Sequence, residues 1–535
     1  MYTIKVNNVE IDIDEDSAIG ITRRGFNFQE PQNLGLSSSN TFSVPATAKN
    51  SKIFGFSSDV SGYTMNNDGV PYSEFYSQVY VDGILVLAGK SYLTNYSGRY
   101  NIKIVDSRNI FDQISNIMLS GTDSLTDELC DIINDEVGLN SSYNDYISYG
   151  SSGTGMLFIP YSAGGLYNSW PYLSTNADNV DEKKDKYEED GTTAEDYNHM
   201  CTEFISGTQL VGNYKGGHFF VSVKTVIETI FSMIDADIIS FPEIESFIRI
   251  PDMILYKDII QNTYYLKDEP DYLYSFSDTG TENRLTALDI LKVVMQEYCL
   301  VLDVYYDSIS ERYKCKFTSL NSVPANTFEL KTTSKPSDIK YLIEGYSKKS
   351  WIAYSGLGGP DDSVITGGLK VEVENESLEE GSDETVFFTI NRYLGSYLIR
   401  VDGNTSTETV QFNLTEKSTY DKIIIVDKGT AAPYTVTVQR IMAGSVDASV
   451  STTLYTAVQS TVGTSNDWDY FENFVRKPVI ISIDCIMNPV IFNNVRQDSL
   501  VRFTGIPGRW YVTSIENYNP NVSNITKVNA ILFRE

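Results

Sequence analysis

The chain contains very little histidine. Among its 535 residues, only His199 and His218 are histidines. Histidine is the usual general base near neutral pH, and a serine or cysteine nucleophile activated by histidine would need one of these two residues. His199 stands in an acidic polar stretch, and His218 follows two glycines before a predicted strand. No GxSxG motif is present. We therefore predict that the chain is not an enzyme and has no catalytic residues.

The common phosphate-binding motifs are also missing. Neither GxxxxGK[ST] nor GxGxxG occurs in the sequence. The glycine-rich segment 355–360 ends in Pro360 and no helical pattern follows it, so we interpret this segment as a turn. These absences predict that the chain has no cofactor.

One acidic segment partly resembles the start of a calcium-binding loop. The loop needs a glycine at its sixth position and a glutamate at its twelfth, but Ser17 and Arg23 stand there. We interpret the segment as the solvated end of a hairpin and predict no metal ligands. Its three acidic residues are Asp12, Asp14 and Asp16.

The sequence lacks paired cysteines and long apolar runs. The five cysteines are odd in number and form no CxxC pair, so we expect buried free thiols in a reducing compartment. No run approaches the roughly 18 apolar residues of a membrane span. The first residues, MYTIKVNNVEIDID, show no signal-peptide pattern, so we expect assembly in a cytoplasm. The cysteines are Cys130, Cys201, Cys299, Cys315 and Cys485.

Positive charge is scarce as well. The chain has 71 acidic and 41 basic residues and a net charge of −30. A protein this acidic is repelled by the phosphate backbone, so we predict no specific nucleic-acid binding. The simplest interpretation of the charge is solubility.

Aromatic residues, in contrast, are abundant. The 37 tyrosines and 25 phenylalanines suit pleated, half-buried surfaces. The segment 79–87 alternates apolar residues around Asp82-Gly83, which is a strong hairpin signal. We predict a mainly β chain with a few helices (β-rich α+β), in a multi-domain β-barrel or β-sandwich architecture. In the last 60 residues we predict strands at Val479–Ile483, Leu500–Phe503, Trp510–Ile515 and Val528–Phe533.

Two segments have the apolar spacing of amphipathic helices. One runs from Val223 to Ile234, and the other from Leu288 to Tyr298 after Thr286 as a candidate N-cap. The second leads into two predicted strands, 300–306 and 313–317. We expect a helix followed by a hairpin.

Changes in composition divide the chain into five predicted regions. Residues 119–215 are rich in Ser, Gly, Tyr and Asn and include a charged run at 178–196, which is typical of a long loop. The regions are 1–118, an N-terminal β-domain; 119–215, a loop-rich arm or insertion; 216–345, an α+β helix–hairpin domain; 346–470, a β-sandwich-like insertion; and 471–535, a closing β-domain.

The two ends of the sequence carry a resemblance. Near the front stand SSSNTFSVPATAKNSKIFGF (37–56), VYVDGILVLAGKSYL (79–93) and YNIKIVDSRNIFDQI (100–114), and the chain ends in GRWYVTSIENYNPNVSNITKVNAILFRE (508–535). These segments resemble the corresponding parts of tail structural proteins from tailed phages of Bacteroidetes, including the crAss-like phages. The resemblance implies no catalytic residues.

The resemblance implies a virion tail protein: a hub, ring or baseplate-type subunit. Such a subunit is expected to form a closed homo-oligomeric ring of three- or six-fold symmetry, to contact other tail proteins, and to surround the path of the DNA. An acidic lumen is expected to let DNA slide. Arg23 and Arg24 are candidates for contact with an acidic neighbouring subunit, or else lie at a solvated edge.

Two other functions stay open at this point. The aromatic residues suit a tail fibre or a receptor- or glycan-binding protein, although the sequence has no repeats typical of a fibre. Paired carboxylates among the 71 acids also leave a polysaccharide depolymerase open.

Overall fold

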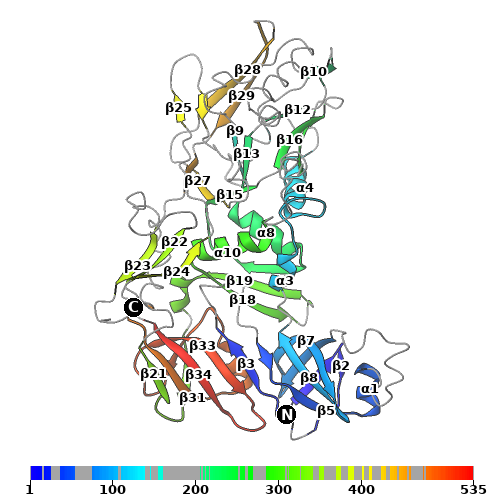
Figure 1. Cartoon of the computed structure of the whole chain (residues 1–535), viewed down its shortest axis with the longest axis vertical. Helices are drawn as coiled ribbons and strands as arrows, with labels where there is room; N and C mark the ends of the chain where they lie inside the picture. Colours follow the sequence, from blue (N-terminus) through cyan, green and yellow to red (C-terminus); the bar gives the residue numbers. More distant parts are fainter. Residues whose placement is uncertain are drawn as a thin grey trace.

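The computed structural model describes the following parts of the chain. The described residues are 2–14, 17–25, 37–54, 75–106, 110–138, 145, 155–160, 205–206, 209–210, 213–215, 217–250, 253–258, 263–268, 285–307, 310, 312–325, 327–341, 349–354, 369–374, 384–390, 400–402, 409–411, 423, 425–428, 434–442, 445–454, 457–459, 474 and 477–533. They form an elongated molecule with β-sheet units at one end, here called the base, and a mixed upper body (Figure 1).

The C-terminal barrel, residues 327–341 and 477–533, closes on itself. Its strands pair in the order β33–β34–β31–β20–β32, and β32 pairs back with β33. Side chains alternate between the interior and the outside along β31, as period-2 strands require. The strands are β20 (Thr327–Thr332), β31 (Ile480–Ile486), β32 (Leu500–Phe503), β33 (Arg509–Tyr518) and β34 (Ile525–Phe533). The short β21 (Asp338–Lys340) continues along β31.

The N-terminal unit, residues 2–25, 37–54 and 75–106, is a curled sheet. Its hairpin turns, Asn7-Asn8 and Asp82-Gly83, have positive φ at both central residues, as a type I′ turn requires. The strand order is β2-β1-β6-β7-β8, with β5 also on β8. The elements are β1 (Tyr2–Val6), β2 (Val9–Glu10), β5 (Phe42–Pro45), α1 (Ala48–Phe54), β6 (Phe75–Val81), β7 (Ile84–Tyr96) and β8 (Arg99–Asp106).

A buried side chain bridges the open side of this curl. Asn50 of α1 is fully buried. Its amide oxygen accepts from the backbone nitrogen of Asp12 at 2.9 Å, and its amide nitrogen donates to the carbonyls of Asp12 and Pro45, both at 2.8 Å. The side chain thus supplies the hydrogen bonds that a neighbouring strand would otherwise make.

The two sheet units of the base are joined by one seam. β3 (Ile21–Arg24) pairs with β33, with Ile21 opposite Tyr518, and β4 (Ser38–Ser39) links β3 to β8. The seam makes the base one 14-stranded sheet. Side chains from both units also share one hydrophobic core. The first and last parts of the chain therefore fold together.

The upper body packs helices against short sheets. Helices α8 and α10 contribute buried apolar faces to a second core, together with β18 and β19. Its helices are α3 (Ile110–Ser115), α4 (Leu125–Val137), α8 (Val223–Ser232) and α10 (Ala287–Glu297), and the 3-10 turn is Leu320–Ala325. One sheet holds β14 (Ala236–Ser240), β19 (Arg312–Ser319) and β18 (Leu300–Asp307).

The remaining described strands form small sheets; β22, β23 and β24 lie beside α10, and the others lie further from the base (Figure 1). One has five strands: β9 (Met156–Pro160), β13 (Gly217–Ser222), β15 (Ser246–Ile250), β27 (Ile425–Lys428) and β30 (Ala457–Gln459). Two have three strands: β12 (Asn213–Lys215), β16 (Met253–Asp258) and β17 (Thr263–Asp268), and β22 (Lys349–Tyr354), β23 (Leu369–Glu374) and β24 (Glu384–Ile390). The pairs are β10 (Ile205–Ser206) with β11 (Gln209–Leu210), β25 (Arg400–Asp402) with β26 (Thr409–Gln411), and β28 (Tyr434–Met442) with β29 (Ser445–Leu454).

The predicted fold class is confirmed: the described residues are mainly β, with a few helices and a small closed barrel. Both predicted helices are present, and at α10 the backbone N–H and hydroxyl of Thr286 donate to the Asp289 carboxylate. The hairpin β18–β19 follows as predicted. The structure differs from the loop-like interpretation of residues 119–215, because the 13-residue α4 lies there with a buried apolar face. It also adds the short α12 (Pro489–Asn494) to the closing β-region. The five domain boundaries stay a prediction.

Candidate functional site

The sequence candidates for chemistry do not form a site among the described residues. His199 and the segment 355–360 lie outside them. The backbone of His218 pairs with Ile159 between β13 and β9, and its side chain is not among those described. No group of three or more His, Cys, Asp or Glu side chains that could hold a metal occurs in the described part. None of the described helices is long and apolar enough to cross a membrane.

The two described acids of the calcium-like segment bind different partners. Asp12 accepts a hydrogen bond from the Thr47 hydroxyl at 2.6 Å, which lowers the pKa of its carboxyl, and lies 3.5 Å from the Lys49 ammonium. Asp14 forms an ion pair with Arg99. The carboxylates are therefore already matched by neighbours of the same chain, while Asp16 lies outside the described residues.

Four of the five cysteines lie in the described part, and all four are free and buried. Burial, with the nearby Asp484 carboxylate, raises the pKa of the Cys485 thiol to about 12. Burial, with a smaller contribution from Asp268, raises the pKa of Cys130 well above its usual value. Such thiols are inert at neutral pH. The prediction of buried free thiols is confirmed for Cys130, Cys299, Cys315 and Cys485.

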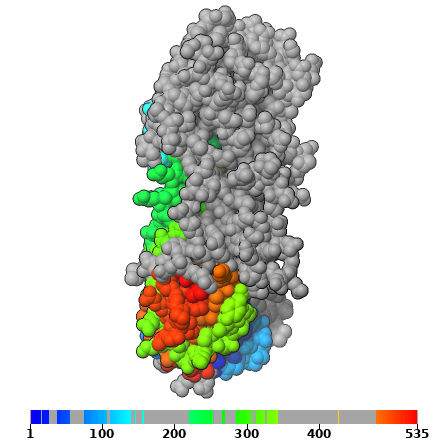
Figure 2. Space-filling view, turned by 90° about the vertical axis from the view of Figure 1, so that its left-hand side faces the viewer, coloured from blue at the N-terminus to red at the C-terminus, as the bar shows by residue number. Residues whose placement is uncertain are grey.

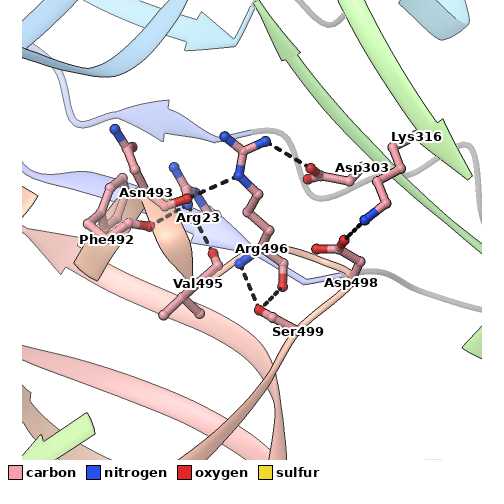
Figure 3. Close-up of polar contacts among 9 residues, drawn as sticks. All are labelled: Arg23, Asp303, Lys316, Phe492, Asn493, Val495, Arg496, Asp498 and Ser499. Carbon is pink, nitrogen blue, oxygen red and sulfur yellow. Dashed lines mark hydrogen bonds and ion pairs between the residues drawn. The ribbon is translucent and has the colours of Figure 1, made fainter. Parts of the chain in front are cut away.

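A cluster of polar contacts lies where the upper body meets the base (Figure 3). We call the loop 495–499, which follows α12, the junction loop. The guanidinium of Arg496 donates to the Asp303 carboxylate of β18 at 3.0 Å. The Lys316 ammonium of β19 donates to the Asp498 carboxylate at 2.6 Å. Both carboxylates are nearly buried, with side-chain exposures of 8% and 10%. Two ion pairs therefore cross from the base to the β18–β19 hairpin.

The base side of this cluster is held by Arg23. Its guanidinium donates to the carbonyls of Phe492 at 2.6 Å and Val495 at 3.1 Å, and lies 4.0 Å from the centre of the Phe492 ring. The Phe492 ring in turn stacks on Tyr518 at 4.4 Å. Contact with a neighbouring subunit stays a prediction for Arg23 and Arg24. Arg24 is exposed, as at a solvated edge, whereas Arg23 is bound within its own chain. Its planar fork satisfies carbonyls at the end of α12 in its own chain.

Further hydrogen bonds fix the junction loop itself. The Gln497 amide donates to the Arg24 carbonyl at 3.0 Å and accepts from the Tyr511 hydroxyl at 3.3 Å. Ser499 accepts from the backbone nitrogen of Arg496 at 3.0 Å and donates to its carbonyl at 2.8 Å. The residues Gln497, Asp498 and Ser499 are all buried.

An apolar contact joins the two bodies beside this polar cluster. The Phe474 ring lies 5.2 Å from Phe533 and 6.0 Å from Tyr511, centre to centre, in edge-to-face arrangements. With Leu500, these side chains belong to the upper-body core although three of them lie in the barrel. Ion pairs and packed aromatic rings therefore hold the two bodies together at the junction. The charged side chains of these ion pairs neutralise one another.

A hollow of about 720 Å³ opens at the β32–β33 turn of the barrel. Arg509 lies 5.5 Å from the centre of the Phe533 ring there. None of its lining residues is a histidine, cysteine or serine. The lining residues are Glu329, Arg502, the segment 503–508, Arg509 and Phe533.

Charge is unevenly distributed between the two bodies. The segments 1–106, 327–341 and 477–535, which contain the base, hold 17 basic and 17 acidic residues. The segments 107–326 and 342–476 hold 24 basic and 54 acidic residues, and so carry the whole net charge of −30. By sequence, the segments that contain the base are thus neutral as a whole, and the remainder of the chain is strongly acidic.

No protein-family model and no curated protein matches this chain. Solved structures that overlap with it include the 43 kDa tail protein of prophage MuSo2 from Shewanella oneidensis, with 8% identity, a TM-score of 0.36, and coverage of 99% of this chain and 98% of that one. Another is the prophage tail protein gp18 from Listeria monocytogenes EGD-e, with 8% identity, a TM-score of 0.35, and coverage of 99% and 94%. Both are named as prophage tail proteins. Overlaps of this size carry no argument about what this chain does, so its function is argued from its own residues.

Sequence reasoning missed the junction. Arg496 and Asp303 are 193 residues apart, and Lys316 and Asp498 are 182 apart, so no local pattern links them. The one available signal was the polar run Arg496-Gln497-Asp498-Ser499 directly before a predicted buried strand.

Proposed function

We propose that this chain is a structural subunit of a phage tail, of the hub, ring or baseplate type. The main observation in support is that the segments that carry the family resemblance fold as one unit, although they lie at opposite ends of the sequence. β5, β7 and β8 from the front of the chain and β33 and β34 from its end belong to one sheet and one core. A ring core shared by related subunits must fold in the same way whatever is inserted in the middle of the chain. Here the two ends of the chain form one such unit.

The charge distribution supports assembly through the base. Copies of the segments outside the base repel one another, since these carry the −30 charge, whereas the segments that contain the base are neutral as a whole by sequence. Subunits that meet side by side at their bases keep the acidic bodies apart. Three copies in a closed ring would bring six sheet units into one layer, which fits the expected three- or six-fold symmetry.

The proposal extends to partners and location. The ring is proposed to contact other tail proteins above and below, to assemble in the host cytoplasm, and to end up in the virion tail. DNA would pass through the lumen without sequence-specific contact, because a chain with a net charge of −30 has little attraction for phosphates.

The test is the oligomeric state of the purified full chain. Mass photometry over a concentration series, with negative-stain microscopy, should give rings with a central hole. Raising the salt concentration should favour these rings, because screening weakens repulsion between the acidic segments. Elongated trimers would point to a fibre instead. A persistent monomer that cleaves host capsule would replace the proposal with a depolymerase.

A further inference from the structure

A row of four side chains crosses the C-terminal barrel at the hollow beside the β32–β33 turn. Glu329 of β20 pairs with Arg502 of β32. Arg509 of β33 pairs with Phe533 of β34. The register of the β32–β33 pairing, continued by one residue, places Arg502 opposite Arg509. Paired residues share one face of a sheet, so the four side chains form one row, and all of them line the hollow of about 720 Å³.

The row has one more positive charge than negative charge. Its one acid, Glu329, accepts a hydrogen bond from the Thr504 hydroxyl at 3.4 Å. The Arg509 guanidinium lies 5.5 Å from the centre of the Phe533 ring. Arg502 is exposed, and within the described part of the chain its guanidinium makes no hydrogen bond or ion pair. Like charges directly opposite each other on paired strands are destabilising, so an anion between Arg502 and Arg509 would relieve their repulsion.

The turn that forms one wall of the hollow is fixed before any ligand binds. The Thr504 nitrogen donates to the Leu330 carbonyl at 3.0 Å, and the Thr332 hydroxyl donates to the Thr504 carbonyl at 2.9 Å. Gly505 and Gly508 have positive φ, which permits the tight turn between β32 and β33. A site that is already held in place loses little conformational entropy on binding.

The hollow lies at the surface and is larger than a single ion needs. Figure 2 shows residues 327–341, drawn in light green, at the surface of the base beside the orange to red C-terminal strands. A volume of about 720 Å³ lies in the range of roughly 300–1,000 Å³ that holds a ligand with several functional groups. The lining combines guanidinium groups with apolar side chains such as Ile506 and Phe533. This combination fits an acidic side chain carried on an apolar peptide segment.

We propose that this row binds an acidic peptide segment of another tail protein, with a carboxylate seated between Arg502 and Arg509. This inference rests on the proposed contacts with other tail proteins and gives the chemistry of one of them. A planar guanidinium donates two parallel hydrogen bonds to a carboxylate, and Arg502 is available for them. A nucleic-acid strand carries a charge at every nucleotide and is repelled by a chain of net charge −30, whereas a peptide needs only the one carboxylate that the row can match.

The first experiment measures the binding of a short peptide to the full chain. The probe is the blocked peptide Ser-Leu-Glu-Leu-Ser with a neutral fluorescent label, and Ser-Leu-Gln-Leu-Ser is its uncharged control. Fluorescence anisotropy should show at least about tenfold weaker binding of the acidic peptide to Arg502→Gln than to the native chain, and no change with Arg24→Gln. Arg24 is the matched control because it is an exposed arginine outside the hollow. No preference of the native chain for the acidic peptide, or no loss with Arg502→Gln, would overturn the proposal.

A stability measurement separates a binding role of Arg502 from a structural one. In the free chain, Arg502→Gln should leave the temperature of thermal unfolding unchanged or raise it, because the substitution removes a charge opposite Arg509. Saturating acidic peptide should raise this temperature in the native chain but not in Arg502→Gln. A lower unfolding temperature of the free variant would mean that Arg502 holds the barrel together, and its assignment to a binding site would be wrong.

Two further measurements separate this site from nucleic-acid binding and from the proposed ring. A single-stranded DNA oligonucleotide should not bind, and DNA binding that Arg502→Gln abolishes would replace the peptide by a phosphate-bearing ligand. Mass photometry should give the same oligomeric state for Arg502→Gln and the native chain. Peptide binding by a chain that stays monomeric would overturn the ring and leave the site standing, whereas rings that bind no acidic peptide would overturn the site alone.

Discussion

The base and the upper body reach stability by different routes. The sequence segments that contain the base are neutral as a whole. The order of the base comes from long-range strand pairing, such as Ile21 with Tyr518, and from buried side chains that replace missing strand contacts. The upper body is built from local units, a capped helix and the hairpin after it, inside sequence segments that carry all the excess acid. In the proposed ring, copies meet through the neutral segments, and the acidic segments project away from the contact.

The sharpest test of the base is Asn50→Ala. The substitution leaves the backbone nitrogen of Asp12 and the carbonyls of Asp12 and Pro45 without their buried partner. Since each unsatisfied buried group costs about 1–3 kcal/mol, we expect a loss of about 3–5 kcal/mol in the free energy of unfolding. Urea unfolding of the full chain, followed by tryptophan fluorescence, measures it.

Asn40→Ala is the matched control for that change. Asn40 also bridges backbone groups, since it accepts from the Gly20 nitrogen and donates to the Ala18 carbonyl, both at 2.9 Å. It is exposed, however, so water can replace its side chain. A loss below about 1 kcal/mol is expected here. Equal losses at the two positions would show that Asn50 does not close the curl.

The seam between the two sheet units should be the next most sensitive point. The Gly25 nitrogen donates to the Thr513 carbonyl at 2.5 Å, and a Cβ on Gly25 would lie 2.6 Å from the Val512 oxygen and 2.9 Å from the Thr513 Cα. Backbone atoms of a central strand cannot move aside cheaply, so Gly25→Ala should cost about 2–4 kcal/mol. Thermal unfolding monitored by circular dichroism measures the loss.

Gly98→Ala separates crowding from backbone strain. Gly98 has φ +80°, but a Cβ added to it would have no neighbouring atom within 4 Å, so only its left-handed conformation resists alanine. We expect a cost of about 1 kcal/mol there. A smaller cost at Gly25 than at Gly98 would mean that the seam is loosely packed.

The sequence was informative where the determinants are local. Asp82-Gly83 between apolar runs predicts its hairpin because only residues that tolerate positive φ form that turn, and Thr286 with Asp289 marks the start of α10. Helix α4 was missed although Ser124 caps it and Leu125, Leu129 and Ile133 recur at four-residue spacing. The Ser-, Gly- and Tyr-rich composition of residues 119–215 favoured a loop, and this signal was given more weight than the helical spacing of the apolar residues.

Long-range contacts lay beyond sequence reasoning. The residues around Arg23 give no sign that it binds the end of a helix about 470 residues later in the sequence. Because Arg24 follows it directly, the two arginines suggested a surface role. The same holds for Asn50, which looks like an ordinary polar residue of a short helix. The junction, which is the candidate site, consists almost wholly of such contacts.

The junction should couple the two bodies with an intermediate effect. Asp303→Ala removes the carboxylate that accepts from Arg496 at 3.0 Å, and because Asp303 is nearly buried we expect a coupling energy of about 1–3 kcal/mol in a double-mutant cycle with Arg496→Ala. In calorimetry, the Asp303→Ala variant should show two separate unfolding transitions in place of the single transition of the native chain. The exposed pair Asp14–Arg99 serves as control, with a coupling energy below about 1 kcal/mol. If the coupling energy of Asp303 and Arg496 is no larger than that of Asp14 and Arg99, the pair contributes no more than an exposed ion pair does.

The smallest expected effect concerns the acidity of the upper body itself. On α4, Asp127, Asp131 and Asp135 follow one another at four-residue spacing, so their carboxylates lie on one face and repel. Partial burial, together with Asp127 and Asp135, raises the pKa of Asp131. A carboxyl whose pKa is raised by folding binds protons more tightly in the folded state, so its charge destabilises the fold at neutral pH, and this penalty disappears as the pH falls through the folded-state pKa.

Asp131→Asn should therefore stabilise the protein at pH 7 by about 0.2–0.5 kcal/mol and have no effect near pH 3. Thermal unfolding at a series of pH values measures the difference. Glu228→Gln should show the opposite sign at pH 7, since Glu228 lies 3.8 Å from Lys224 on α8 and loses an attractive partner. A stabilisation by Asp131→Asn that persists unchanged at pH 3 would rule out charge repulsion as its cause. If Asp131→Asn instead destabilises at pH 7, the acidic face of α4 is compensated by groups elsewhere in the chain, and the self-repulsion inferred for the acidic segments must be given up.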